Sequence, residues 1–153
     1  SGEGSPLDPN SIVELPVKDG KAYVPAAGSE EEAALSKAIA DTTHTWVVLV
    51  DEEGYPAESM NVDDYLRALY DGRKKVPLLE FCQKPIVTTD SDLTVDRVLP
   101  QLDVESEHIG DRALDREVIL YWGDRTKRII TGADLLGRLL HGIVIRRNAD
   151  TLD

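Results

Sequence analysis

Hydrophobic residues in this chain recur at two spacings, one typical of strands and one typical of helices. Dense β-branched and aromatic runs at 45–50 and 117–122 predict strands, because such side chains pack well on a pleated surface. Each run is followed by a turn rich in charged residues and glycine, and then by a short returning strand. The chain is therefore expected to form two β-hairpins, with further strands upstream at 21–27 and 85–89.

The sequence predicts helices at four places in the chain, one of which begins near Val95 after several possible caps at 90–94 and is followed by a polar loop at 105–116. A Ser-x-x-Glu capping box, in which two side chains satisfy free N–H groups of the first turn, begins a helix expected over about 30–42. Asn61 and Thr131, which are both good helix-capping residues, directly follow the two returning strands. Apolar positions at helical spacing then predict helices over about 61–70 and 134–140.

The same order of elements occurs twice along the chain. A strand, a helix, a hairpin and a second helix follow one another in each half, and such self-similarity indicates an internal repeat. Matching helix starts are 65 residues apart for Ser29 and Thr94, and 70 residues apart for Asn61 and Thr131. The expected limits are a flexible tail or linker at 1–20, a first repeat at 21–76, a second repeat at 77–144 and a C-terminal tail at 145–153. Within the first of these segments, packing of the apolar stretch Ile12-Val13-Glu14-Leu15 stays open as an alternative.

One stretch of the second half carries a resemblance to a known family. The residues Arg128-Ile-Ile-Thr-Gly-Ala-Asp134-Leu-Leu resemble the signature of the cystathionine-β-synthase (CBS) domain, in which an apolar pair precedes Thr or Ser, two variable residues and Asp. The segment from Val87 to Asp96 is similar to the strand-to-helix junction of that family. The resemblance spans about residues 20–144 and implies an α/β (α+β) fold of two β-α-β-β-α CBS repeats, packed as a pseudo-twofold Bateman module.

The same resemblance implies a binding site for AMP, ADP, ATP, S-adenosylmethionine or a related adenosyl ligand in the cleft between the repeats. In that case Thr131 contacts a phosphate, because free N–H groups and the positive end of a helix favour an anion. Asp134 takes the ribose, because a carboxylate accepts hydrogen bonds from both hydroxyls of a cis-diol. The other residues that the resemblance places at the ligand are Thr88, Thr89, Val118 and Ile119.

A structural role for the same residues stays open. Thr131 and Asp134 also fit a simple helix cap, since the same free N–H groups serve both purposes. In the first half Asn61 replaces the threonine, and Asp64 takes the place of the aspartate. Asn is an excellent cap, and the nearby acids Glu58 and Asp63 repel a phosphate. We therefore expect Asn61 and Asp64 to serve the helix, and at most one well-formed nucleotide site.

Composition narrows the functions further. The chain has 17 basic and 29 acidic residues, and its net charge of −12 opposes binding to nucleic acid or to an anionic membrane surface. No apolar run is long enough for a membrane span. The single Cys82 excludes an internal disulfide and favours a reducing cytoplasm. Histidines without metal-site spacing, and the lack of any catalytic or phosphate-loop motif, indicate no enzyme, no metal and no required cofactor.

These patterns predict a noncatalytic regulatory module. A bound adenine nucleotide is expected to change the arrangement of the repeats or of a homodimer, whose candidate surfaces are the apolar faces of the helices at 62–70 and 134–144. An effector domain outside this chain is a further expected partner. Two alternatives stay open, namely a CBS-type dimerisation or interaction scaffold without a nucleotide, and an acidic domain that binds a basic protein as inhibitory or immunity proteins do.

Overall fold

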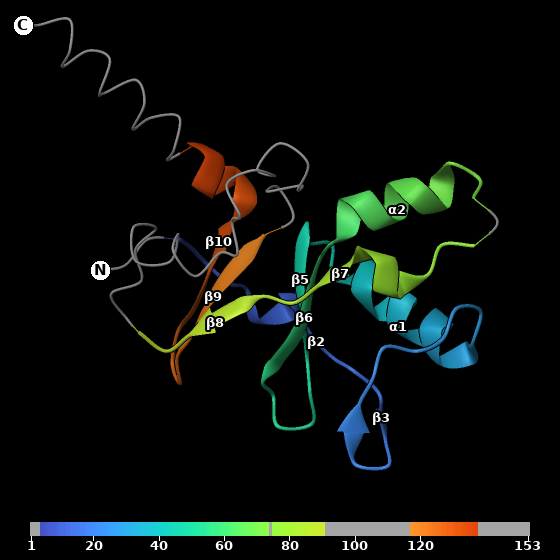
Figure 1. Cartoon of the computed structure of the whole chain (residues 1–153), viewed down its shortest axis with the longest axis horizontal. Helices are drawn as coiled ribbons and strands as arrows, with labels where there is room; N and C mark the ends of the chain where they lie inside the picture. The colour runs from blue at the N-terminus through green and yellow to red at the C-terminus, as the bar shows by residue number, and fades with distance from the viewer. Residues whose placement is uncertain (1–3, 74, 91–116, 138–153) are drawn as a thin grey trace, which may run out of the picture. The chain divides into compact units, whose positions relative to one another are not determined.

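The computed structural model describes residues 4–73, 75–90 and 117–137 (Figure 1). The chain divides into two compact units, and each is considered by itself. The first unit comprises residues 7–85, and the second unit comprises residues 1–6 together with 86–153. The chain therefore passes from one unit to the other twice, once after Pro6 and once after Pro85.

The first unit contains a four-stranded mixed sheet in the order β2-β5-β6-β7. Its strands are β2 (Ile12–Glu14), β5 (Trp46–Val50), β6 (Pro56–Asn61) and β7 (Cys82–Gln83). The central pair β5 and β6 is the predicted hairpin, while β2 runs parallel to β5 and β7 runs antiparallel to β6. The β-branched run at 46–50 forms its centre, as the sequence predicts.

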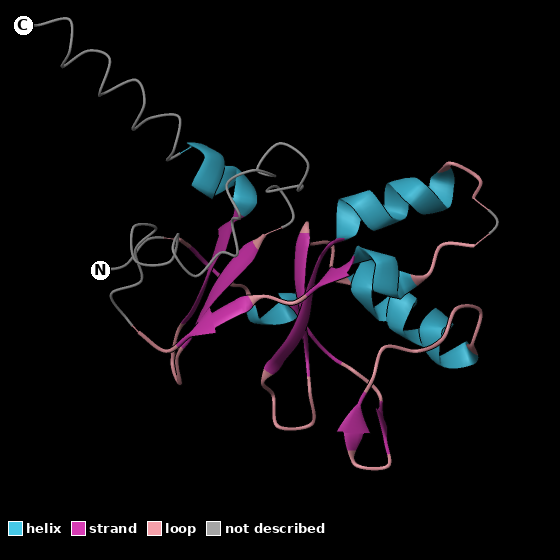
Figure 2. Cartoon of the chain, viewed as in Figure 1, coloured by secondary structure: helices cyan, strands magenta, loops and turns pink. Residues whose placement is uncertain are grey.

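Two helices, α1 (Glu30–Asp41) and α2 (Val62–Tyr70), follow the predicted starts (Figure 2). The Ser29 hydroxyl accepts a hydrogen bond from the Glu32 N–H at 3.1 Å, and the Glu32 carboxylate accepts one from the Gly28 N–H at 3.0 Å. The first bond satisfies an N–H group that the helix itself leaves without a partner, and the second ties the residue before the cap to the first turn. Two short 3-10 helices complete the unit, η1 (Pro9–Ser11) and η2 (Leu78–Phe81).

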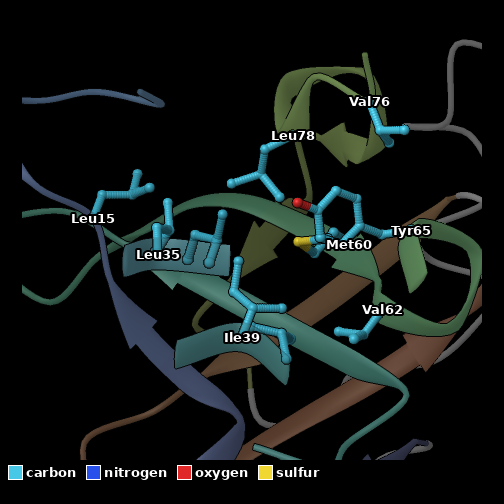
Figure 3. Packing of buried hydrophobic residues seen from close by; sticks show 10 residues of the cluster. Leu15, Leu35, Ile39, Met60, Val62, Tyr65, Val76 and Leu78 are labelled. Atoms are coloured by element: carbon cyan, nitrogen blue, oxygen red, sulfur yellow. The ribbon is translucent and has the colours of Figure 1, made fainter. Parts of the chain in front are cut away.

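The core of the first unit lies between these helices and one face of the sheet. Side chains from α1, α2, the central hairpin and the segments around them form one buried cluster (Figure 3). Its fully buried members include Ile39, Leu49 and Leu78. The Tyr65 ring packs edge-on against Phe81, with ring centroids 5.5 Å apart. The opposite face of β5 is buried as well, at Val48 and Val50, which explains the continuous apolar run of this strand.

The second unit contains a sheet of the same plan, in the order β1-β10-β9-β8. Its strands are β1 (Ser5–Pro6), β8 (Ile86–Thr88), β9 (Val118–Trp122) and β10 (Lys127–Thr131). Here β8 runs parallel to β9, the pair β9 and β10 forms the second predicted hairpin, and β1 runs antiparallel to β10. A helix begins at Gly132 and is described as far as Gly137.

The two sheets match strand for strand. In each, a parallel strand flanks the first strand of a hairpin, and an antiparallel strand flanks the second. Asn61 pairs with Trp46 at the end of one hairpin, and Thr131 pairs with Val118 at the end of the other. A helix starts at the next residue in both units. The mixed α/β class predicted from the sequence is confirmed.

The prediction of a tail or linker at 1–20 is wrong for much of that segment. Ile12 to Glu14 pair with β5, and Leu15 is buried in the core of the first unit. The strand expected at 21–27 reduces to β4 (Lys21–Ala22), which pairs only with β3 (Val17–Lys18) in a two-stranded ribbon. The β-branched Ile12 and Val13 offer better pairing for the buried sheet than the segment at 21–27.

The limits of the two units also differ from the expected repeats. Leu78 and the strand β7 belong to the first unit, so it ends at residue 85 instead of 76. The helix expected from Val95, the loop at 105–116 and the tail at 145–153 lie outside the described residues. Within 4–73, 75–90 and 117–137, no helix is both long and apolar enough to cross a membrane.

Candidate functional site

Thr131 and Asp134 form a reciprocal cap at the start of the helix in the second unit. The Thr131 N–H and the Thr131 hydroxyl both donate to Oδ2 of Asp134, at 3.1 Å each. In return the Asp134 N–H donates to the Thr131 hydroxyl at 3.4 Å. Thr131 ends β10 and Asp134 is exposed, so the strand and the first helical turn bring both polar groups to the surface. The alternative of a helix cap is therefore realised in the structure.

Thr131 and Asp134 keep hydrogen-bonding capacity beyond this cap. A carboxylate offers about four acceptor positions, and the bonds to Thr131 occupy only part of that capacity. Asp134 is thus able to accept hydrogen bonds from a diol, whereas a phosphate at Thr131 has to exchange its bonds for those already formed. Each hydrogen bond of this cap contributes about 0.5–1.5 kcal/mol to stability. Hydrogen bonds to a charged ligand are stronger, so a bound phosphate is able to replace that contribution.

The strand β9 brings Val118 beside this helix start, but buries it. Val118 is the register partner of Thr131, and Ile119 is the next residue along the strand. Successive side chains of a strand point to opposite faces, so a ligand on one face meets only one of the two. Both side chains are fully buried. A base can reach either of them only after other atoms have moved away.

Thr88 and Thr89 do not lie with Thr131. Because β8 is parallel to β9, Ile86 pairs with Ile119 while Thr88 pairs with Tyr121. Thr88 is thus three positions along β9 from Val118, which is about 10 Å at the usual rise of a strand. Its hydroxyl accepts a hydrogen bond from the Asp90 N–H at 3.0 Å. The expectation of one pocket shared by Thr88, Thr89 and Thr131 is not supported by this register.

The residue of β8 that lies level with the end of β10 is Ile86, which the sequence interpretation did not include, and the strand β9 separates it from Ile130. It pairs with Ile119 and is half-buried. No signal in the sequence distinguishes the two ends of β8, since both are apolar or β-branched. Ile86 takes this position because β8 runs parallel to β9. The relative direction of two strands is set by the tertiary structure.

The equivalent helix start in the first unit is used differently. The Asn61 side-chain oxygen accepts from the Asp64 N–H at 3.1 Å, which confirms the predicted cap. The Val62 N–H donates to the Thr45 carbonyl at 2.7 Å, and the Val62 side chain is buried where the second unit has Gly132. Asp64 lies 3.8 Å from the Arg67 guanidinium. This turn engages its N–H groups with the protein as the Thr131 turn does, but its acid lies beside Arg67 instead of bonding back to the cap residue.

Cys82 and Glu58 form a second cluster of titratable groups, at the edge of the first sheet. Burial, and then the nearby Glu58 carboxylate, raises the pKa of the Cys82 thiol to about 12. The thiol donates to the Leu78 carbonyl at 3.4 Å. Glu58 is itself paired with Lys84, with Oε1 and Nζ 3.6 Å apart. Since the thiolate is the reactive form, this cysteine suits a structural role.

Neither metal binding nor a known relative adds to this picture. Among the described residues, no group of three or more His, Cys, Asp or Glu side chains is placed to hold a metal ion. Comparisons of the chain with protein-family models, with curated proteins and with solved structures found no match. The duplicated units and the helix start at Thr131 are therefore the features that bear on the function of the chain.

Proposed function

We propose that the chain is a noncatalytic regulatory module of the CBS-pair type, which binds an adenine nucleotide or a related adenosyl ligand at the helix start formed by Thr131 and Asp134. The duplication of one sheet plan in the two units supports this proposal, because a tandem repeat is what the family resemblance implies. Further support comes from the equal placement of Asn61 and Thr131, each at the end of its hairpin and directly before a helix.

The observation that carries the proposal is the contrast between the two helix starts. Both units have a buried residue at the first helical position, Gly132 or Val62, but the second unit then has the neutral Ala133 and an exposed Asp134 carboxylate. The first unit has a buried valine at the same position and a second acid, Asp63, that accepts a hydrogen bond from Thr45 at 3.2 Å. A phosphate therefore meets less negative charge at the helix start of the second unit, which is the difference that favours an anion there.

The proposal is tested by thermal unfolding of the whole chain with AMP, ADP, ATP, NAD and S-adenosylmethionine in turn. A ligand at a concentration 100 times its Kd stabilises the folded state by about 2.7 kcal/mol, which raises the melting temperature measurably. We expect Asp134→Ala to abolish the shift and Asp64→Ala, the matched change in the first unit, to preserve it. If no compound shifts the melting temperature at millimolar concentration, the nucleotide proposal fails.

A second candidate is a dimerisation scaffold, which exposed apolar side chains on the helices favour. Leu69 and Tyr70 at the end of α2 are 43% and 87% exposed, and Leu136 in the helix of the second unit is 48% exposed. Such side chains are stabilised when a partner covers them. Sedimentation velocity of Leu69→Ser/Tyr70→Ser against the unchanged chain tests this candidate. Equal sedimentation of both proteins would count against these side chains as a dimer surface.

A further inference from the structure

The loops that close the two hairpins carry opposite charge at equivalent places of the fold. The loop between β5 and β6 is Asp-Glu-Glu-Gly-Tyr at 51–55, with three acidic residues and no basic one, so its charge is −3. The loop between β9 and β10 and the start of β10 read Gly-Asp-Arg-Thr-Lys-Arg at 123–128, with three basic residues and one acidic, so their charge is +2. We name these segments the acidic hairpin end and the basic hairpin end.

The acidic hairpin end is an ordered turn with two of its acids directed to solvent. One carboxylate oxygen of Asp51 accepts hydrogen bonds from the N–H groups of Glu53 and Tyr55, both at 2.9 Å. Asp51 thereby shapes the turn, whereas Glu52 and Glu53 are exposed. Half of the Tyr55 surface is exposed beside them. The loop thus presents carboxylates and an aromatic ring on a defined backbone.

The basic hairpin end is equally well ordered, because its cations pack on aromatic rings. The Lys127 ammonium lies 4.9 Å from the centre of the Trp122 ring and donates to the Gly123 carbonyl at 3.3 Å. The Arg128 guanidinium lies 4.8 Å from the centre of the Tyr121 ring. Adjacent residues of a strand point to opposite faces, so these two pairs place positive charge on both faces of the hairpin. Arg125 extends this charge to the exposed loop.

We propose that the acidic hairpin end of one copy of the chain binds the basic hairpin end of a second copy, so that the chain self-associates. Both complementary surfaces belong to one sequence, so copies of the same chain supply both sides of the contact. Copies with a net charge of −12 repel one another on average, so an approaching acidic loop gains attraction only at a locally basic segment, and the basic hairpin end is such a segment. The proposal does not depend on nucleotide binding.

A charge-exchange experiment tests this contact with two variants of the whole chain. Glu52→Lys/Glu53→Lys changes the acidic hairpin end from −3 to +1, since two acids become two bases, and keeps Asp51 because it shapes the turn. Arg125→Glu/Thr126→Glu changes the basic hairpin end from +2 to −1, and keeps Lys127 because it packs on Trp122. Each variant then carries like charges at both ends, whereas a mixture of the two restores opposite charges in both contacts.

Sedimentation velocity without nucleotide at low salt is the measurement. We expect the unchanged chain to self-associate, each variant alone to associate at least about tenfold more weakly, and an equimolar mixture to recover association. At about 1 M salt, where the screening length falls to about 3 Å, the association is expected to weaken as well. Glu30→Lys/Glu31→Lys at the exposed start of α1 is the control, because it alters the net charge as much as the first variant does.

Three results would overturn the proposal. The first is a chain that stays monomeric at low salt, and the second is association that both variants leave unchanged. The third is a lower melting temperature in each variant with no recovery of association in the mixture, which would indicate pairing of the two ends within one chain. Circular dichroism of both variants shows whether each has kept its fold. If one has not, Glu52→Lys alone (acidic hairpin end from −3 to −1) and Arg125→Glu alone (basic hairpin end from +2 to 0) replace them, and each is expected to weaken association by itself without recovery in a mixture.

Discussion

One carboxylate oxygen of Asp134 holds both the backbone N–H and the hydroxyl of Thr131, at 3.1 Å each. This relationship joins the end of a strand to the first turn of a helix, and it places the candidate ligand groups in contact with each other. A phosphate or ribose at this position therefore competes with a cap that the protein already forms. Ligand binding and the stability of this turn are coupled in consequence.

Substitution of Thr131 by Ala is expected to lower the free energy of unfolding by about 0.5–2 kcal/mol, because the Asp134 N–H then loses its side-chain acceptor. Thr131→Ser retains the hydroxyl and should recover most of the loss. Urea unfolding followed by circular dichroism measures both variants. A stability equal to that of the unchanged chain in Thr131→Ala would show that the cap contributes little.

Leu15 provides a test of the corrected N-terminal segment. It is buried in the core of the first unit directly after β2, so Leu15→Ala should destabilise the protein by about 2–5 kcal/mol through lost contacts and a residual cavity. Val17→Ala, on the exposed ribbon two residues later, is expected to change the stability by less than about 0.5 kcal/mol. Denaturant unfolding compares the two variants. Equally small effects would show that Leu15 contributes as little to stability as a residue of a flexible tail.

Tyr65 and Ser36 join α2 to α1 through their hydroxyl groups, whose oxygens are 2.8 Å apart. Tyr65→Phe removes this hydrogen bond and retains the ring against Phe81, so we expect a loss of about 0.5–1.5 kcal/mol. A double-mutant cycle with Ser36→Ala isolates the pair. Fully additive effects of the two substitutions would show that the hydroxyls are not coupled.

The raised pKa of Cys82 predicts that the protein becomes less stable at alkaline pH. Folding raises the pKa of its thiol from the ordinary 9.0 to about 12, so the native state keeps the proton that the unfolded chain loses in this range. Its contribution to stability is complete below pH 9.0 and declines as the pH rises towards about 12. Unfolding free energies of the unchanged chain should therefore fall more steeply over this interval than those of Cys82→Ala.

The same shift predicts slow modification of the folded protein. Alkylation by iodoacetamide near pH 8 requires the thiolate, whose fraction at Cys82 is small in the native state. The unfolded chain in urea should react much faster at the same pH. Equal rates in the two states would contradict the raised pKa of this thiol.

The sequence by itself determined the elements whose cause is local. The starts of α1 and α2 follow from Ser29 and Asn61, because a capping side chain bonds to N–H groups only two or three residues away. Both hairpins follow from β-branched runs and the short turns between them. The opposite charges of the two hairpin loops are also present in the sequence, since they need only the composition of each turn.

Only the tertiary structure decided which distant segments complete each sheet. The choice of Ile12 to Glu14 over 21–27 beside β5 depends on competition between two remote segments, for which no local pattern gives a rule. The direction of β8 against β9 likewise separates Thr88 from Thr131 and sets Ile86 opposite Ile119. Parallel pairing joins residues far apart in the chain, so its register is set by the packing of the whole unit.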